Sequence, residues 1–262
     1  MNRLKLKIGA MALACTAGLF ALAPAGFAQD KDWKGFYVGG NVGGAFGGSD
    51  AQTTTVFSAT GYFATTSVPA IATAGAQHIS PSGFSGGGQA GYNIQSGHFV
   101  LGAEADFGGM SLSSSRSTTA VYPCCAPTSF TITQSMKTSW LFTARPRVGY
   151  ARGRALVYGT AGLAMTNVNY QETFTDTFAT AAENGGVKKS QTGWTAGGGV
   201  EYRAGSHWSL RGEYLYADFG KVSTVSTNFT AFSPAEAFPT NPFTHSATLH
   251  SHIARFGVNY RF

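Results

Sequence analysis

The chain has 262 residues, of which 13% are aromatic and 35 are Gly, whereas only 11% are charged, with a formal net charge of +6. So few charged residues are unusual on the surface of a soluble protein and are typical of a β-barrel. After residue 28 no run of about 18 apolar residues follows, which excludes a transmembrane helix there. Three of the basic residues precede residue 28, and the remaining ones form no patch interleaved with aromatics, so we expect no nucleic-acid partner.

The first segment, residues 1–28, has the features of a secretory signal peptide. Three basic residues precede an apolar run, and the small residues Gly26 and Ala28 fit the positions before a cleavage site. Processing as a lipoprotein at Cys15 is the alternative, but the apolar run before this cysteine is too short. We therefore expect a signal peptide over residues 1–28 and a single β-barrel domain over residues 29–262.

β-Strands account for the rest of the chain, beginning with one over residues 36–46. Tight turns at Ser96-Gly97, Arg152-Gly153 and Gly205-Ser206 each separate two alternating runs, and we expect their glycines to have the positive φ that such hairpins need. The last strand covers about residues 249–262. This layout predicts an all-β fold, an eight-stranded antiparallel up-and-down transmembrane β-barrel with both ends on one side; ten strands are the alternative.

Long polar stretches lie between these hairpins. They are rich in Thr, Ser, Ala and Pro, and we expect them to form long outer loops. Residues 53–62 and 130–133 nevertheless have a β-forming composition, so these residues either extend strands beyond the bilayer or form an extra hairpin. The four loops are expected at residues 49–81, 111–134, 171–190 and 221–247.

The end of the chain shows the strand pattern most clearly. Every second residue from Phe256 to Phe262 is aromatic or aliphatic, whereas the residues between them are mostly polar, and a period of two indicates a β-strand. Over residues 156–168 the pattern does not decide which side chains face the lipid, because Tyr158 and Leu163 would lie on opposite faces of the strand. In the other strands the same alternation predicts a lipid-facing set that includes Val38, Phe99, Leu101, Ala103, Val148, Val200 and Leu210.

The charged residues of the strands fall on the opposite face, which points into the barrel. An eight-stranded barrel is just wide enough to be filled by its own side chains, and buried charges persist only when they are paired. We expect ion pairs across the lumen that hold the barrel closed; a narrow ion path along the same charges is the alternative. The expected network consists of Glu104, Asp106, Arg145, Arg147, Glu201, Arg211, Glu213 and Arg255.

Four segments resemble a known family. They are WKGFYVGGN at residues 33–41, GQAGYN at 88–93, EYLY at 213–216 and the ending RFGVNYRF at 255–262. In these segments the chain resembles the small outer-membrane β-barrel proteins of alphaproteobacteria, the porin-family or surface-antigen proteins related to OmpA-like transmembrane barrels. The resemblance implies a structural or surface protein of the cell outer membrane, and we expect it to contribute to envelope integrity and surface presentation. A narrow porin for ions or small solutes and a loop-borne binder of haem, metal or a surface partner are the alternatives. It implies outer-membrane lipid, lipopolysaccharide and the barrel-assembly machinery as partners, and leaves the oligomeric state open.

Two adjacent cysteines, Cys124 and Cys125, lie in the second expected loop. The signal peptide directs the chain to an oxidising compartment, where disulfides persist. We therefore expect a disulfide between these neighbours at the tip of the loop, with no chemical role. Pairing with another molecule and metal binding are the alternatives.

Three histidines, His245, His250 and His252, cluster near the outer end of the last strand. An H-x-H pair with a third ligand can bind a transition metal or haem iron, but such clusters are more often solvated, so we expect no metal or other cofactor.

The six histidines of the chain form no recognisable arrangement with a Ser and an acid. The glycine runs lack the Lys-Ser/Thr of a phosphate-binding loop. We expect no enzymatic activity.

Overall fold

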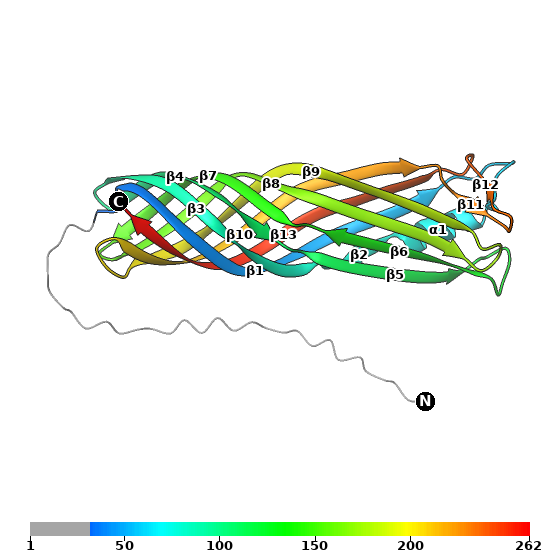
Figure 1. Cartoon of the computed structure of the whole chain (residues 1–262), viewed down its shortest axis with the longest axis horizontal. Helices are drawn as coiled ribbons and strands as arrows, with labels where there is room; N and C mark the ends of the chain where they lie inside the picture. Colours follow the sequence, from blue (N-terminus) through cyan, green and yellow to red (C-terminus); the bar gives the residue numbers. More distant parts are fainter. Residues whose placement is uncertain (1–31) are drawn as a thin grey trace, which may run out of the picture. The chain divides into compact units, whose positions relative to one another are not determined.

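Eight long antiparallel strands close into a barrel in the computed structural model of this chain, which describes residues 32–262 (Figure 1). The expected signal peptide over residues 1–28 lies outside the described residues. The strands of the ring are β1 (Gly35–Thr55), β3 (Ser82–Ser96), β4 (Phe99–Met110), β7 (Trp140–Arg152), β8 (Ala155–Asp176), β9 (Ala182–Arg203), β10 (Trp208–Ser226) and β13 (Phe243–Arg261). Each pairs with the strand before and after it in this order, and β13 pairs with β1 to close the ring.

Tight turns join strands at the end of the barrel that carries the C-terminus, here called the terminal end (Figure 1). Gly97 and Gly153 have φ values of +59° and +62°, as predicted for two-residue connections. The prediction is wrong for Gly205, whose φ is not positive. Four residues separate β9 from β10, and Ala204 N donates to Trp208 O over 3.0 Å, so this wider turn needs no left-handed residue.

The predicted bounds of the four long loops are wrong, because many of those residues continue the strands. β1 continues to Thr55, β8 to Asp176 and β10 to Ser226, and β13 already begins at Phe243. In these extensions the outward-facing residues, such as Thr173, are mostly polar, so the alternation of apolar and polar residues that marks a membrane strand is lost. Thr is β-branched and keeps its preference for extended structure, which explains why the strands persist.

An extra hairpin of β5 (Ser113–Val121) and β6 (Ser129–Lys137) continues the barrel wall where β4 and β7 stop. β6 pairs with β8, and β5 pairs with β3 at a single residue. Both alternatives for the β-forming loop segments therefore occur: residues 53–55 extend β1, and residues 130–133 belong to the extra hairpin. The ring nevertheless has eight strands, as predicted.

A helix, α1 (Ser67–Gly75), and the short strand β2 (Gln77–Ile79) lie next to β1 at the opposite end, here called the distal end (Figure 1). β2 pairs with β1, and the Gln77 side-chain amide donates to Ile132 O over 3.1 Å. Within residues 32–262, no helix has the length and apolar character needed to cross a membrane. The chain segment that connects β10 to β13 contains two further short strands, β11 (Thr230–Ala231) and β12 (Glu236–Ala237), which pair with each other.

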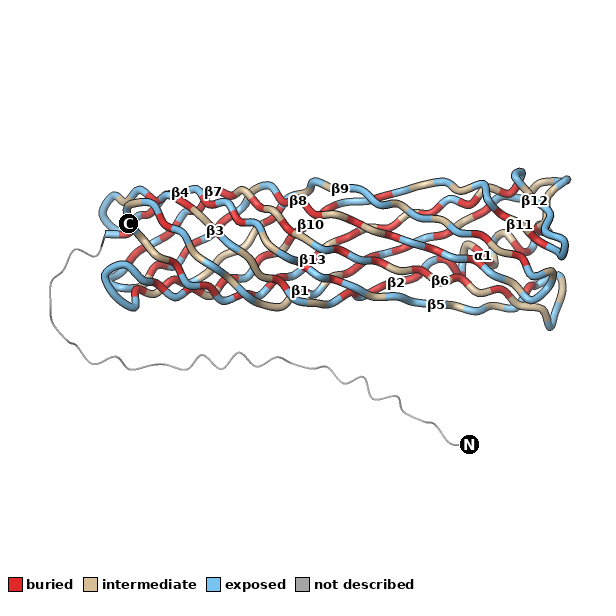
Figure 2. The backbone as a smooth tube through the Cα atoms, in the orientation of Figure 1, coloured by how far each residue is buried: buried red, intermediate tan, exposed pale blue. Residues whose placement is uncertain are grey.

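Buried residues recur along the whole length of the barrel (Figure 2). Their side chains fill the interior in successive layers. In β13 the inward-facing residues run from Arg255 through Ile253 and Leu249 to His245 and Phe243, all of them at most 3% exposed. These residues belong to four layers. The charged layer consists of Glu104, Asp106, Arg145, Arg147, Glu201, Arg211, Glu213 and Arg255, and the middle apolar layer lies around Met110, Leu141, Tyr170, Leu215, Phe219 and Ile253. The distal polar layer consists of Glu172, Glu183 and His245, and the aromatic cap lies around Phe63, Phe130, Phe174, Phe229 and Phe243.

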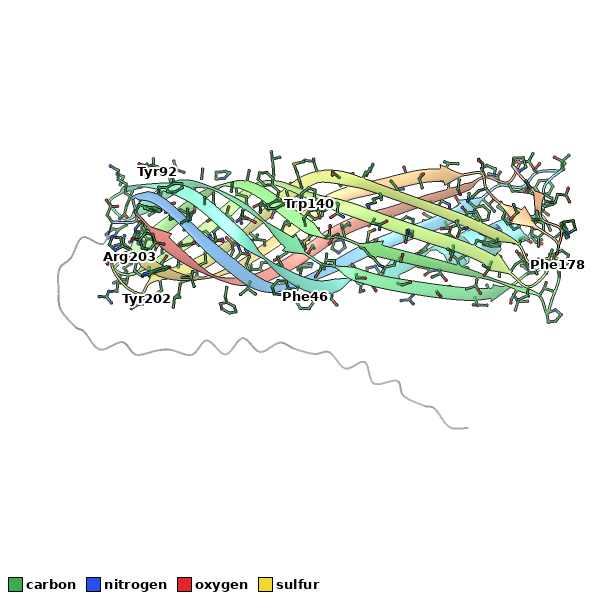
Figure 3. The ribbon with its side chains drawn as sticks, in the orientation of Figure 1. Phe46, Tyr92, Trp140, Phe178, Tyr202 and Arg203 are labelled. Atoms are coloured by element: carbon green, nitrogen blue, oxygen red, sulfur yellow. A yellow bond between two sulfur atoms is a disulfide. The ribbon has the colours of Figure 1, made fainter. Side chains whose placement is uncertain are left out.

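An apolar belt surrounds the half of the barrel nearest the terminal end. Tyr92 and Tyr202 lie close to that end and Phe46 and Trp140 about halfway along (Figure 3). A membrane-spanning strand needs about 9–11 residues. Because β8 has 22 residues, it is long enough to cross a bilayer and extend well beyond it. The exposed residues of the belt include Val38, Phe99, Leu101, Val148, Val200 and Leu210, as expected for a lipid-facing set.

The facing of β8, which the sequence left open, follows a regular alternation. Tyr158 is 4% exposed and points inward, and its hydroxyl donates to Glu213 Oε1 over 2.8 Å. Leu163 is 60% exposed and points outward. The ambiguity arose because an aromatic residue can occupy the lumen when its polar end finds a partner there.

Candidate functional site

The charged layer brings together the eight residues that we expected to face the lumen, each of them at most 5% exposed. Arg145 Nη2 lies 2.8 Å from Glu104 Oε1 and 2.8 Å from Asp106 Oδ2. Arg145 on β7 and Glu104 on β4 are direct partners in the strand register. The local pairing of two strands therefore positions this ion pair.

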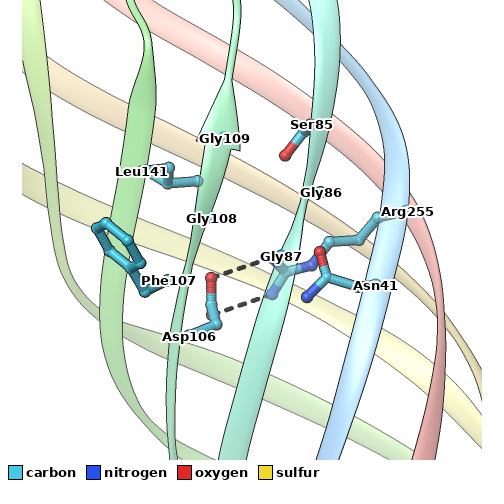
Figure 4. A pocket seen from close by; sticks show the side chains of 10 residues that line it. All are labelled: Asn41, Ser85, Gly86, Gly87, Asp106, Phe107, Gly108, Gly109, Leu141 and Arg255. Carbon is cyan, nitrogen blue, oxygen red and sulfur yellow. Dashed lines mark hydrogen bonds and ion pairs between the residues drawn. The ribbon is translucent and has the colours of Figure 1, made fainter.

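Arg211 and Arg255 connect this pair to the other side of the lumen. Arg211 contacts Glu104 through both terminal nitrogens, and its Nη2 lies 3.1 Å from Glu213 Oε2. Arg255 Nη2 lies 2.6 Å from Glu213 Oε2, and Arg255 Nη1 lies 3.1 Å from Asp106 Oδ1. The close view shows the guanidinium group of Arg255 in contact with the carboxylate of Asp106 (Figure 4).

Two tyrosines that were absent from the predicted network complete the charged layer. Tyr37 donates to Glu104 Oε2 over 2.6 Å and accepts a hydrogen bond from Arg147 Nη1 over 2.9 Å. Arg147 Nη2 also lies 2.9 Å from Glu201 Oε2, and its guanidinium carbon lies 4.1 Å from the centre of the Tyr158 ring. Tyr37 has the parity of the inward-facing residues of its strand, and this signal could have identified it, whereas the sequence left the facing of Tyr158 open.

In charge, the layer is balanced, with four guanidinium groups and four carboxylates. Removing ions from water costs several kcal/mol each, and only close pairing with opposite charges compensates for this cost. Here the side chains provide that compensation to one another across the lumen. In this arrangement the charged side chains fill one level of the lumen and connect the strands that surround it.

Trp33 lies inside the terminal end, next to the charged layer. Its side chain is 1% exposed, and its backbone N–H donates to Gln95 Oε1 over 2.6 Å. The guanidinium carbons of Arg203 and Arg261 lie 4.9 Å and 5.4 Å from the centre of its ring. The indole is thus held by cation–π contacts at the mouth of the lumen.

Cys124 and Cys125 are joined to each other by a disulfide in the turn between β5 and β6. Cys124 is exposed, and its sulfur lies 3.6 Å from Ser67 Oγ at the start of α1. Cys125 is half-buried and packs against the aromatic cap. The pair therefore lies at the distal tip of the barrel, where the turn meets the helix.

The three clustered histidines do not form a common site. His245 is fully buried and points into the lumen, whereas His250 and His252 lie on the outer face of β13. The rings of His250 and His252 lie 6.2 Å apart, and both are next to Tyr216. Positions 245 and 250 differ in parity, so a strand places their side chains on opposite faces.

The distal polar layer is a second buried cluster of ionisable groups. His245 Nδ1 lies 3.3 Å from Glu172 Oε2, and His245 Nε2 lies 3.3 Å from Glu183 Oε1. Glu172 lies in the part of β8 beyond the apolar belt. Its burial is the main cause that raises its pKa to about 10, and the neighbouring carboxylate of Glu183 adds to this shift. Neither glutamate was predicted as a site residue, because both lie in a stretch that was expected to be a loop.

Known proteins with similar sequences belong to bacterial outer membranes. The family model described as outer membrane protein beta-barrel domain matches residues 11–262. The 31 kDa outer-membrane immunogenic protein of Brucella melitensis biotype 1 is 36% identical over 190 residues, which cover 72% of this chain and 70% of that protein. The 22 kDa outer membrane protein of Rhizobium leguminosarum bv. viciae is 30% identical over 193 residues, which cover 71% of this chain and 64% of that protein. Among solved structures, OprG from Pseudomonas aeruginosa gives a TM-score of 0.42 at 10% identity, covering 89% of this chain and all of that one.

Proposed function

Because this chain belongs to the outer membrane protein beta-barrel domain family, we propose that it is a closed barrel that contributes to envelope integrity and presents its distal half at the cell surface. The protein is an outer-membrane β-barrel protein. In the proposed orientation the terminal end faces the periplasm. Outer-membrane lipid and lipopolysaccharide are the proposed partners of the apolar belt.

The filled lumen is the observation that carries this proposal. Trp33, the charged layer, the middle apolar layer and the aromatic cap follow one another along the interior. Separating one partner of a buried ion pair costs about 3–5 kcal/mol. An ion path through the charged layer would require several such separations at once, which favours a plug over a pore.

The outer face of the distal half supports a role in surface presentation. Beyond the apolar belt the outward-facing residues include Asp50, Thr173 and Lys188, all of them exposed. Polar outward-facing side chains suit contact with water rather than with lipid. The Brucella melitensis relative is named an immunogenic protein, which is consistent with a segment exposed at the surface.

Planar-bilayer recordings of the detergent-extracted protein test this proposal. We expect no stepwise conductance above that of the bare bilayer. Persistent open channels that disappear in Arg145→Gln or Glu213→Gln would overturn the plug and support an ion path along the charged layer. Glu236→Gln is the matched control, because Glu236 is exposed in β12 and lies outside that layer.

Recognition by the barrel-assembly machinery is a further element of the proposal. Phe262 is 72% exposed, and its ring lies 5.7 Å from that of Phe36. The resemblance to this family implies that an aromatic C-terminus is what the machinery reads. Deleting Phe262 is expected to lower the amount of protein in the outer membrane, whereas Phe99→Ala, at another exposed aromatic of the terminal end, keeps it. Equal amounts of both variants would contradict this element.

We assign no enzymatic reaction to the protein. The outward-facing His250 and His252 contact the rings of Tyr214 and Tyr216, and the named relatives are described as outer-membrane proteins. Lipid A from cells that overproduce the protein is expected to be unchanged. A shortened acyl pattern would overturn this assignment.

A further inference from the structure

Three buried side chains of the distal polar layer converge inside the barrel, one each from β8, β9 and β13. We propose that Glu172, Glu183 and His245 bind a divalent transition-metal ion, with Zn²⁺ as the best-fitting ion. One nitrogen of His245 and one oxygen of each glutamate lie within 4.8 Å of one another. Two ligands of one zinc ion, each about 2.0–2.2 Å from it, lie up to ~4 Å apart, so small side-chain rotations bring all three into bonding distance.

The charge of the cluster calls for a cation. Glu172 and Glu183 are both fully buried, and the only basic side chain that pairs with them among the described residues is His245. The buried arginines within residues 32–262 belong to the charged layer or to the terminal end. Two carboxylates and a neutral imidazole neutralise one divalent ion, whereas without it the cluster needs extra protons.

Unpartnered oxygen atoms are the second, independent sign of a ligand. Within the described chain, neither carboxylate oxygen of Glu172 accepts a hydrogen bond, and Glu183 Oε2 also has no donor. Buried carboxylate oxygens without a donor are costly, and such groups normally find a hydrogen bond or a metal ion. The only basic contact of Glu172 Oε2 among the described residues is the 3.3 Å ion pair with His245 Nδ1, so these carboxylates belong to the same cluster as the imidazole.

Neighbouring hydroxyls favour this use of His245. Thr53 Oγ1 lies 3.3 Å from His245 Nδ1, and Ser226 Oγ lies 2.9 Å from His245 Nε2. A histidine that binds a metal through one ring nitrogen usually makes a hydrogen bond through the other, which fixes its orientation. Each of the two ring nitrogens therefore has a hydroxyl that can take this supporting role while the other nitrogen binds the ion.

The choice of metal follows from the ligand types. Ca²⁺ and Mg²⁺ prefer sites built of oxygen atoms only, whereas imidazole suits Zn²⁺ and the neighbouring transition metals. The site lies between the middle apolar layer and the aromatic cap, and the ring of Phe243 is stacked 6.1 Å from that of His245. We therefore infer that the ion enters as the barrel folds and exchanges slowly afterwards.

Metal analysis of refolded protein tests the proposal. The full chain is unfolded with a chelator, refolded in detergent with an equimolar amount of Zn²⁺, and freed of unbound metal before elemental analysis. The wild type is expected to retain about one zinc ion per chain. Glu172→Gln and His245→Ala are expected to retain at least about tenfold less. The matched control, His250→Ala, removes an outward-facing histidine and is expected to retain the full amount.

Three results would overturn the proposal. A wild-type barrel that folds fully and retains no zinc would show that protons alone neutralise the cluster. Zinc retained by His245→Ala but lost from His250→Ala would show a site on the outer face. X-ray absorption of zinc in the wild type is independent of the folding of any variant. It is expected to show one imidazole nitrogen among oxygen ligands, and a shell of oxygens alone would also refute the assignment.

Discussion

Arg255 shows how one side chain can connect distant strands of the barrel. Its partner Glu213 lies directly opposite on the adjacent strand β10, so the strand register alone predicts this contact. Its other partner, Asp106, lies on β4 and is reached only because the sheet closes on itself. The alternation of the strands therefore predicts which charges face inward, whereas the pairs that cross the lumen depend on the closed barrel.

The first prediction concerns Glu213, which lies within 3.4 Å of arginines 145, 211 and 255. Glu213→Gln removes a buried negative charge and leaves these guanidinium groups undercompensated, so it is expected to lower the free energy of unfolding by about 3–5 kcal/mol. Urea unfolding in phospholipid vesicles measures the change. The exposed control, Glu236→Gln, is expected to stay within about 0.5 kcal/mol of the wild type. A similar loss of unfolding free energy in both variants would mean that the buried ion pairs of Glu213 do not contribute to the stability of the barrel.

At the scale of elements, the approach of β3 and β4 depends on particular glycines. A Cβ atom on Gly108 would lie 2.2 Å from Gly86 O and 2.6 Å from Gly87 Cα, whereas a Cβ on the adjacent Gly109 would meet nothing closer than 3.9 Å. Gly108→Ala is therefore expected to destabilise the barrel by about 1–3 kcal/mol through overpacking. Gly109→Ala is expected to be neutral or slightly stabilising, since Ala restricts the unfolded chain. Chemical unfolding compares the two, and equal stabilities would show that the strands can move apart.

The hairpin of β5 and β6 carries the disulfide at its tip. A bond between adjacent residues closes a minimal loop and removes little freedom from the unfolded chain. Replacing both Cys124 and Cys125 with Ser is therefore expected to change the free energy of unfolding by less than about 1 kcal/mol. Mass spectrometry of cell-surface protein after alkylation without reductant is expected to find neither cysteine alkylated, because the disulfide leaves no free thiol. Two alkylated thiols would show that the bond does not form in the cell.

The distal halves of the strands show why part of the candidate site could not be predicted. The membrane strands were recognisable because residues such as Val148 alternate with Arg147, but the outward-facing Thr173 is as polar as a loop residue. Once residues 171–190 were assigned to a loop, no strand register connected Glu172 with Glu183. In the structure, β8 and β9 pair through this stretch and bring both carboxylates to the lumen. The charged layer was accessible to sequence reasoning, whereas of the distal polar layer only His245 was identified.

At the scale of the whole molecule, the outer surface divides the barrel into two halves with different surroundings. The apolar belt covers the half nearest the terminal end, and mostly polar outward-facing residues cover the distal half. The interior has no such division, because buried side chains follow one another from Trp33 to the aromatic cap. The position of the bilayer is thus set by outward-facing residues, while closure of the barrel depends on inward-facing ones.

The last prediction tests this division with the same substitution in each half. Ala103 lies midway between Phe99 and Phe107 on the outer face of β4, in the centre of the belt, whereas Thr173 is exposed in the distal part of β8. An arginine facing lipid at the bilayer midplane costs about 2–4 kcal/mol. Ala103→Arg is expected to show this loss, and Thr173→Arg is expected to remain within about 0.5 kcal/mol of the wild type, as for an ordinary surface substitution. Unfolding from phospholipid vesicles measures both variants. Comparable losses would place the distal half in lipid as well, and the polar face of β8 would then need a partner other than water.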